Sequence, residues 1–315
     1  MKKLKIWIEC ARLRTLPVSL SGVIIAIGVA MWQHVFNLVP AVLCVLFALL
    51  AQVVSNMANE YYDFLKGTDK PGRVGPRRGV TEGDITPKKL RNVTFTLLVL
   101  DCIVGLCLLP YGGWWMLPVG VVIAIFALAY SAGPYPLSYH GLGEAAVFVF
   151  FGIVPVVFTH FVQAHTIKPT MEFNPLILLA SMSIGFMAVN VLLINNYRDV
   201  DDDREANKRT SVVIFGRKPA AAAYLINGFV AMGLLSPLWF GIIVSTAIMP
   251  LTGQAELPLP LWTLVAPALY LVLHTATWYK LIHRDGVALN PLLGGTARNM
   301  LFFTLIMFAA FFVGM

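Results

Sequence analysis

The chain contains 315 residues, of which 58% are hydrophobic and 12% are charged, and its formal net charge is +7. Soluble domains carry roughly twice this share of charged residues, so the composition excludes an ordinary soluble protein. Because the basic residues lie in short loops between apolar runs, they indicate membrane topology and argue against nucleic acid as a partner.

Apolar runs long enough to cross a bilayer recur along the whole chain. We therefore expect an all-α, polytopic membrane protein in which residues 1–315 form a single membrane-embedded domain. The segment from Met1 to Arg14 mixes basic and apolar residues, which predicts a short interfacial helix. Nine transmembrane helices are predicted, at Leu16–Trp32, Leu38–Asn59, Val93–Leu109, Trp114–Ser131, Leu142–Val162, Pro175–Asn195, Ala220–Ser245, Leu261–Tyr279 and Arg298–Gly314. Pro237 predicts a kink in the seventh.

The lysines and arginines predict the orientation of these spans. If the nine helices alternate in direction, all 23 basic residues except Lys168 fall on one side. Basic loops are retained in the cytoplasm. We therefore expect a bacterial cytoplasmic (inner) membrane protein with its N-terminus in the cytoplasm and its C-terminus outside.

Two polar motifs end the second and sixth predicted spans. The first, NEYYDFLKGTD, runs from Asn59 to Asp69, and the second begins with NNYRD at Asn195 and continues to Asp203. Asn59 and Asn195 are 136 residues apart. Spans one to four then correspond to spans five to eight, which predicts two four-helix pseudo-repeats of parallel topology. Both motifs fall on the cytoplasmic side.

The spacing within each motif places oxygen ligands on one helical face. Both motifs lie at helix C-termini, where the helix dipole disfavours anions, so a bound cation would stabilise them. Ligands that are all oxygen favour Mg²⁺, which often shares its coordination shell with substrate phosphates. The predicted metal ligands are Asn59, Asp63, Asp69, Asn195, Asp199 and Asp203, and the predicted catalytic acids among them are Asp63, Asp199 and Asp203.

Basic residues in the same loops predict a diphosphate site that a metal ion bridges to the acids. Acids alone would suggest a cation channel, and bases alone would suggest an anionic lipid site. The alternative for both sets is that they are solvated charges at helix ends. The predicted diphosphate-binding residues are Lys66, Arg73, Arg77, Lys208 and Arg209, with Arg78 beside them.

Polar and aromatic residues near the motifs predict the walls of a substrate pocket. Gln52 and Ser55 lie deeper in the second span, although Gln52 could instead bond to a neighbouring helix. The turn at residues 130–139 presents tyrosines that either form an interfacial belt or stabilise a developing cation. The predicted pocket residues are Gln52, Ser55, Tyr62, Tyr130, Tyr135 and Tyr139. Asp101 could line this cavity or be a neutral, packed acid. Asn190 could line it or bond to a neighbouring helix, and Glu144 could line it or simply suit the N-terminus of the fifth span.

Three motifs together resemble the UbiA superfamily of intramembrane prenyltransferases. They are residues 59–79 (NEYYDFLKGTDKPGRVGPRRG), 130–144 (YSAGPYPLSYHGLGE) and 195–210 (NNYRDVDDDREANKRT), and a weaker signal lies at residues 12–17 (RLRTLP). The first motif closes at Asp69, with Gly67 where hydroxybenzoate-type relatives carry an acid. This spacing is most similar to the dihydroxynaphthoate branch of menaquinone synthesis. Glu60 departs from the family pattern, which usually has Asp there.

The resemblance implies an Mg²⁺-dependent transfer of a polyprenyl group from an allylic diphosphate to 1,4-dihydroxy-2-naphthoate. The acids and amides would hold two Mg²⁺ ions on the diphosphate, the allylic C–O bond would ionise in a dry pocket, and the ring would attack with loss of CO₂ and a proton, giving demethylmenaquinone. The isoprenoid tail would lie between helices near membrane lipid. The alternatives are another acceptor (hydroxybenzoate, homogentisate or haem) and a cation-coupled transporter.

Overall fold

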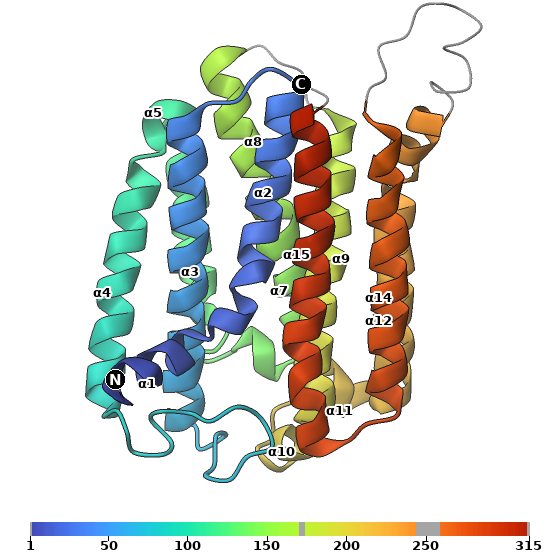
Figure 1. Cartoon of the computed structure of the whole chain (residues 1–315). Helices are drawn as coiled ribbons and strands as arrows, with labels where there is room; N and C mark the ends of the chain where they lie inside the picture. Colours follow the sequence, from blue (N-terminus) through green and yellow to red (C-terminus); the bar gives the residue numbers. More distant parts are fainter. Residues whose placement is uncertain (1, 170–173, 244–258, 314–315) are drawn as a thin grey trace, which may run out of the picture.

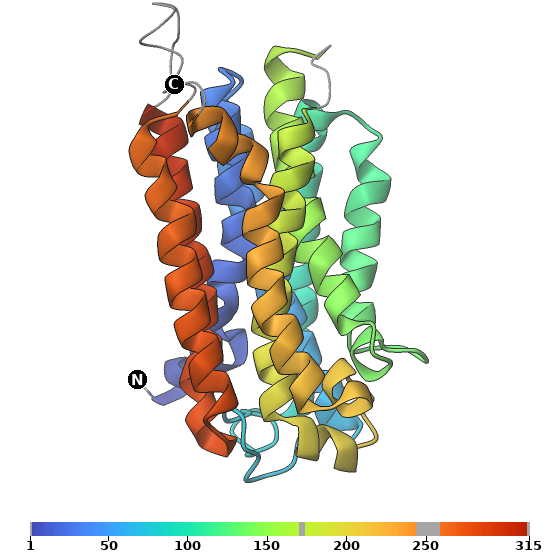
Figure 2. The same ribbon diagram turned by 90° about the vertical axis from the view of Figure 1, so that its right-hand side faces the viewer.

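The computed structural model describes residues 2–169, 174–243 and 259–313, and this part of the chain is helical. The helices run roughly along one axis as a bundle (Figures 1 and 2). The longest are α2 (Leu16–Trp32), α3 (Leu38–Leu65), α4 (Pro87–Leu106), α9 (Pro175–Arg198), α12 (Arg217–Leu234), α14 (Val265–Ile282) and α15 (Asn290–Val313). The described residues form no strand, and their only isolated β-bridge joins His140 to Arg209.

Seven helical runs in the described ranges are long and apolar enough to cross a membrane, so the protein is an integral membrane protein. Their bounds are Leu4–Trp32, Leu38–Leu65, Pro87–Gly112, Gly143–Ile167, Pro175–Arg198, Leu261–Ile282 and Gly286–Val313. An eighth run is bent by 46° between Arg217–Leu234 and Ser236–Ile243, which confirms the kink expected at Pro237.

The fourth predicted span is shorter in the structure than the sequence predicts, and its helix is not among the runs long enough to cross a membrane. It corresponds to α6 (Met116–Ala129), which has 14 residues and is shorter than the other spans. Several predicted boundaries were also too short, because α3 continues past Asn59 to Leu65 and α15 begins at Asn290. The predicted ends at Ser245 and Gly314 lie outside the described residues.

Local sequence explains where several helices begin and how closely they pack. Asn37 and Asn174 cap α3 and α9 by accepting hydrogen bonds from backbone N–H groups two residues later, at 3.2 and 2.8 Å. The fifth run is built from α7 (Gly143–Val147), a π-helical segment η3 (Phe148–Ile153) and α8 (Val154–Ile167). Gly152 of η3 lies against Gly185 of α9, where a Cβ on Gly152 would come within 2.4 Å of the facing backbone. Only glycine permits this approach.

One end of the bundle collects the short helices and loops, and we call it the loop end (Figure 1). It carries α1 (Lys2–Ala11), α10 (Val200–Glu205), α11 (Ser211–Phe215) and the loop at residues 66–86. A small apolar cluster that includes Cys10, Met57 and Val80 fastens α1 and this loop to α3. The two acidic motifs, far apart in the sequence, therefore meet at the same end of the molecule.

Candidate active site

A cavity of about 270 Å³ lies at the loop end, between the ends of α3 and α9 and the loops that cover them. All six residues predicted as metal ligands line it: Asn59, Asp63, Asp69, Asn195, Asp199 and Asp203. The helical spacing in each motif supplies one wall of the cavity, and the fold brings the two walls together.

Asp63 faces this cavity from the last turns of α3. Asn59 Nδ2, one turn earlier, donates to Asp63 Oδ2 at 3.0 Å, and Tyr139 Oη donates to Asp63 Oδ1 at 2.8 Å. Tyr139 Oη also lies 2.6 Å from Thr68 Oγ1. The Asp63 side chain is only 3% exposed, so these donors take the place of water around its charge.

The second motif holds its acids at the junction of α9 and α10. Arg198 Nε and Nη2 donate to the two carboxylate oxygens of Asp199 at 2.6 and 2.7 Å, a bidentate pair. The same Nη2 donates to Asn195 Oδ1 at 2.7 Å. Asp203 follows one turn later on α10 and is buried.

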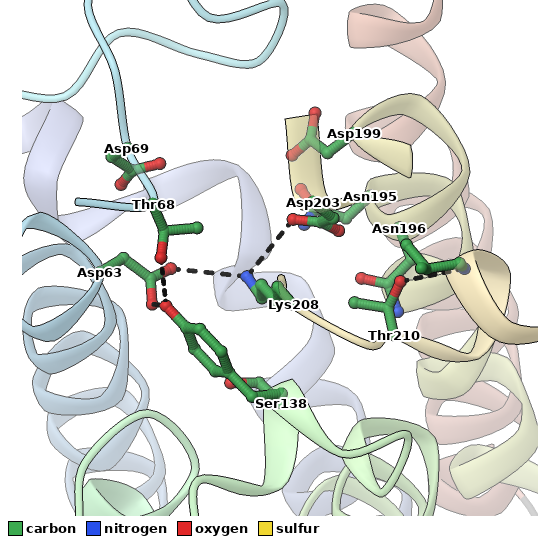
Figure 3. A network of polar contacts seen from close by, with 12 residues as sticks. Asp63, Thr68, Asp69, Ser138, Asn195, Asn196, Asp199, Asp203, Lys208 and Thr210 are labelled. Atoms are coloured by element: carbon green, nitrogen blue, oxygen red, sulfur yellow. Dashed lines mark hydrogen bonds and ion pairs between the residues drawn. The ribbon is translucent and has the colours of Figure 1, made fainter. Parts of the chain in front are cut away.

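Two cations from the loops pair with acids of both motifs, and Figure 3 shows one of them, Lys208, between Asp63 and Asp203. Lys208 Nζ is 3.5 Å from Asp63 and 3.7 Å from Asp203. Arg73 Nη1 is 2.7 Å from Asp69, and its Nη2 is 2.8 Å from Asp199. Lys208 and Arg73 each form ion pairs with one acid of the first motif and one acid of the second.

Burial and charge give the acids of the second motif different proton affinities. Burial raises the pKa of Asp203 to about 7, although the charge of Lys208 opposes the shift. Burial also acts on Asp199, but hydrogen bonds and charge from Arg198, together with the charge of Arg73, outweigh it and lower the pKa of Asp199. The Asp203 carboxyl therefore has a higher pKa than the Asp199 carboxyl and holds its proton more tightly.

The donor set fits a hard divalent cation, because it consists of carboxylate and carboxamide oxygens. Within the described ranges, no three His, Cys, Asp or Glu side chains are grouped closely enough to hold a metal. Lys208 and Arg73 fill the spaces between the carboxylates instead.

The structure separates the predicted phosphate-binding residues into different environments. Arg73 and Lys208 line the cavity. Lys66 does not appear among the described lining residues; its Nζ donates to Ser131 O at 2.7 Å and lies 4.2 Å from the centre of the Tyr139 ring.

The neighbouring arginines Arg77 and Arg78 point in different directions. Arg78 is buried, lines the cavity and donates to Asp69 Oδ2 at 3.1 Å. Arg77 is 47% exposed and forms an ion pair with Asp84 outside the cavity. Arg209 does not appear among the described lining residues, and its backbone N–H donates to Tyr139 O at 3.1 Å. Of these two arginines, Arg78 therefore lines the cavity and Arg77 does not appear among the described lining residues.

A second, mostly apolar cavity of about 150 Å³ lies deeper in the bundle, between α3, α6 and the η3–α8 run. The two cavities share Gln52, Ser55 and Tyr130 as lining residues, together with Val147 and Phe151. Three predicted pocket residues thus lie where a polar chamber meets an apolar one. An amphipathic molecule with a charged head group and a hydrocarbon tail would match the linings of these two cavities.

The remaining predicted tyrosines lie in less enclosed positions. Tyr62 packs edge-on against Tyr61, with ring centres 5.0 Å apart, and does not appear among the described lining residues of either cavity. Tyr135 is 59% exposed and stacks on His140. Tyr139 contacts the site through its hydroxyl group, as described above.

Two glutamates near the motifs have different surroundings. Glu60 is buried one turn before Asp63 on α3 but does not appear among the described lining residues, and it accepts hydrogen bonds from Val80 N at 3.1 Å and Cys10 Sγ at 3.4 Å. Glu60 therefore holds the loop against α3, and this contact accounts for a glutamate at the position where the family pattern usually has Asp. Glu144 lines the cavity and accepts a hydrogen bond from Asn196 Nδ2 at 2.9 Å.

Two polar residues inside the spans, Asn190 and Asp101, line neither of the two cavities described above. Asn190 donates to Tyr224 O at 3.1 Å and accepts from Asn227, so it joins α9 to α12. Asp101 is buried on α4, its Oδ1 has no hydrogen-bond partner among the described residues, and it lines neither cavity. We find no physical account of its position.

Arg12 is one of the cavity residues that were not assigned to the site from the sequence. It lines the cavity from the joint between α1 and α2, and its Nη2 donates to Asn59 Oδ1 at 2.6 Å. The weak RLRTLP signal contained this residue but offered no spacing that would link it to α3.

Comparisons with known proteins agree with this arrangement. The UbiA prenyltransferase family matches residues 20–288. The chain is 33% identical to a 1,4-dihydroxy-2-naphthoate octaprenyltransferase of Escherichia coli (strain K12), over 98% of this chain and 95% of that protein. Its fold resembles an apo UbiA homolog from Aeropyrum pernix K1 (16% identity, 94% of this chain and 97% of that one, TM-score 0.64). It also resembles a UbiA homolog from Archaeoglobus fulgidus bound to DMAPP and Mg²⁺ (15% identity, 97% and 99%, TM-score 0.59). The chain therefore belongs to the UbiA prenyltransferase family.

Proposed function

We propose that the protein transfers a polyprenyl group from an allylic diphosphate to 1,4-dihydroxy-2-naphthoate with loss of CO₂, a step of menaquinone synthesis. The name of the Escherichia coli relative, which aligns with nearly the whole chain, supports this acceptor. The observation that carries the proposal is the pair of cavities that share lining residues, one lined by acids and cations and the other mostly apolar. Such a pair suits a diphosphate with a long hydrocarbon tail.

The predicted metal ligands would hold Mg²⁺ against the diphosphate, with Asp63, Asp199 and Asp203 as the carboxylates and Asn59 and Asn195 as the amides. The Archaeoglobus fulgidus homolog bound to DMAPP and Mg²⁺ supports this choice of metal. When bound, the metal neutralises charge that builds up on the leaving diphosphate.

The cations of the site would complete the diphosphate contacts. Lys208 and Arg73 now pair with carboxylates and would turn to phosphate oxygens when those carboxylates bind metal. Arg78, also at the cavity wall, adds a third positive charge. Because these donors are held by α3, α9 and their loops, little reorganisation is needed as the C–O bond breaks.

The inner chamber would protect the allylic cation and hold the isoprenoid tail. Its lining is mostly apolar, which limits water near the cation. Tyr130 borders both chambers and presents an aromatic face where positive charge would develop. The acceptor ring would attack from the polar chamber.

We further propose that α6 and the bent α12 run complete a nine-span arrangement, with the loop end in the cytoplasm. The exposed apolar side chains of α6, including Val121 and Ile125, support contact with lipid despite its length. The distribution of basic residues supports the orientation. The 136-residue offset between Asp63 and Asp199, which meet across one cavity, supports the four-helix pseudo-repeat.

A panel of acceptors tests the proposed function. Purified protein in nanodiscs would be supplied with one polyprenyl diphosphate, Mg²⁺ and, in turn, dihydroxynaphthoate, hydroxybenzoate, homogentisate and haem. We expect dihydroxynaphthoate to be preferred over every other acceptor. A higher kcat/KM for any of the others would refute the assigned acceptor, and cation flux into liposomes without product would indicate a transporter.

A further inference from the structure

Arg12 is a cation of the active-site cavity with no acidic partner. Arg73, Arg78 and Lys208 each pair with an aspartate, whereas no carboxylate among the described residues pairs with Arg12. Its Nη2 donates to the neutral amide of Asn59, and its Nε is buried without a hydrogen-bond partner. The charges of Glu60 and Asp69 act on the partly buried guanidinium, but neither carboxylate forms an ion pair with it, so Arg12 can still pair with an anion that comes from outside the chain.

The backbone at Arg12 supports this reading. Arg12 has φ 51° and ψ 54°, a left-handed conformation that is unfavourable for any residue except glycine. The turn ends α1 and begins the η1 segment (Leu13–Thr15), and the Thr15 N–H and hydroxyl both donate to Arg12 O at 2.9 Å. Strained backbone of this kind persists where the surroundings enforce it, often at ligand sites. Here it holds the guanidinium against α3 at the cavity.

Gln52 provides a complementary group in the same cavity. Its Nε2 donates to Thr15 Oγ1 at 3.2 Å and to Asn56 Oδ1 at 3.3 Å, while its Oε1 is buried and has no hydrogen-bond donor. Gln52 lies about two turns below Asn59 on the same face of α3 and borders both chambers. The cavity wall therefore holds one donor without a partner, Arg12 Nε, and deeper in the bundle one acceptor without a donor, Gln52 Oε1.

We propose that Arg12 and Gln52 form the subsite for the aromatic acceptor, in which Arg12 binds the ring carboxylate and Gln52 accepts a hydrogen bond from a ring hydroxyl. This inference rests on the proposed function, since dihydroxynaphthoate carries both groups. A diphosphate has no hydroxyl group at neutral pH to satisfy Gln52, and the loop cations already serve it. The acceptor would then be selected by its charge as well as by its shape.

Two acceptors that differ only in the carboxylate test the role of Arg12. Kinetics would be measured for 1,4-dihydroxy-2-naphthoate and 1,4-dihydroxynaphthalene with one polyprenyl diphosphate, for wild type, Arg12→Gln, Arg12→Lys and the control Arg14→Gln. Arg14 is exposed and two residues away. We expect Arg12→Gln to lower the preference for the carboxylated acceptor about 10- to 100-fold, the range for a charge-assisted hydrogen bond. Arg12→Lys should restore part of the preference, and Arg14→Gln should leave it unchanged.

Different outcomes separate this inference from its rival. If Arg12→Gln raises the KM of the polyprenyl diphosphate and leaves the acceptor preference unchanged, Arg12 serves the diphosphate and the inference is wrong. Should the variant fail to fold, inhibition of the wild type decides: 1-hydroxy-2-naphthoate must compete with the acceptor far better than 1-naphthol does, and equal inhibition refutes the inference. Failure of the wild type to use dihydroxynaphthoate at all would instead refute the proposed function.

Discussion

Asp63 and Glu60 lie three residues apart on α3, and replacing each carboxylate by its amide should have very unequal effects on activity. Asp63 faces the cavity, and Lys208 Nζ lies 3.5 Å from it. Glu60 faces the loop that contains Val80. The Asp63→Asn and Glu60→Gln variants each remove one negative charge from almost the same place in the fold, so each is the control for the other.

The structure gives the size of the expected effect. Two unit charges 3.5 Å apart interact by about 5 kcal/mol at an effective dielectric constant of about 20. If about half of an interaction of this size is lost in the transition state when the charge of Asp63 is removed, the rate falls about 100-fold, because each 1.4 kcal/mol or so is a factor of ten. Glu60→Gln keeps an oxygen to accept the Val80 N–H, so its activity should remain within about threefold of wild type.

The assay is Mg²⁺-dependent formation of prenylated naphthol product by protein in nanodiscs, measured by chromatography at saturating acceptor. Thermal unfolding of both variants checks that they fold. Equal losses in the two variants, or an Asp63→Asn enzyme with more than a tenth of wild-type activity, would refute the orientation of α3 on which the site depends.

Three further predictions follow from the same geometry. Arg78→Ala should lower kcat/KM for the polyprenyl diphosphate at least tenfold, whereas Arg77→Ala should change it less than threefold in the same assay, because Arg77 pairs with Asp84 outside the cavity. Gly152→Ala should destabilise the protein by about 1–3 kcal/mol, seen as a lower unfolding temperature, because a Cβ there would come within 2.4 Å of the backbone of α9; Gly233→Ala, which has open space around it, should not. Because Asp203 has its pKa raised to about 7 and must ionise to bind metal, the Mg²⁺ concentration for half-maximal binding should fall about tenfold from pH 6 to pH 8, whereas a flat profile would contradict its role as a ligand.

The parts of the molecule with regular periodicity were predictable from sequence. Most span positions followed from hydropathy, and the four-residue spacing from Asn59 to Asp63 placed both side chains on the cavity face of α3. Spacing alone does not separate Glu60 from Asp63, which follows it by three residues; the hydrogen bonds from Val80 N and Cys10 Sγ hold Glu60 against the loop and α1. The α6 helix was expected to be longer, since apolar composition does not reveal where a short turn replaces the last helical residues.

The loops carry no such periodicity, and there sequence reasoning reached its limit. Arg77 and Arg78 are adjacent and chemically identical, yet only the path of the loop places Arg78 in the cavity and Arg77 outside it. Arg12 enters the site through a left-handed turn that is not signalled by glycine or asparagine. Contacts between segments distant in the sequence, such as Lys208 with Asp63, depend on tertiary structure alone.

The fate of the acceptor carboxylate tests the central claim most directly. Dihydroxynaphthoate labelled at its carboxyl carbon would be incubated with purified protein and a polyprenyl diphosphate, with Mg²⁺ or with EDTA. We predict one labelled CO₂ released for each prenylated product, and neither in EDTA. Prenylated product that keeps the label, or full transfer in EDTA, would contradict a metal-dependent, decarboxylating prenyltransferase.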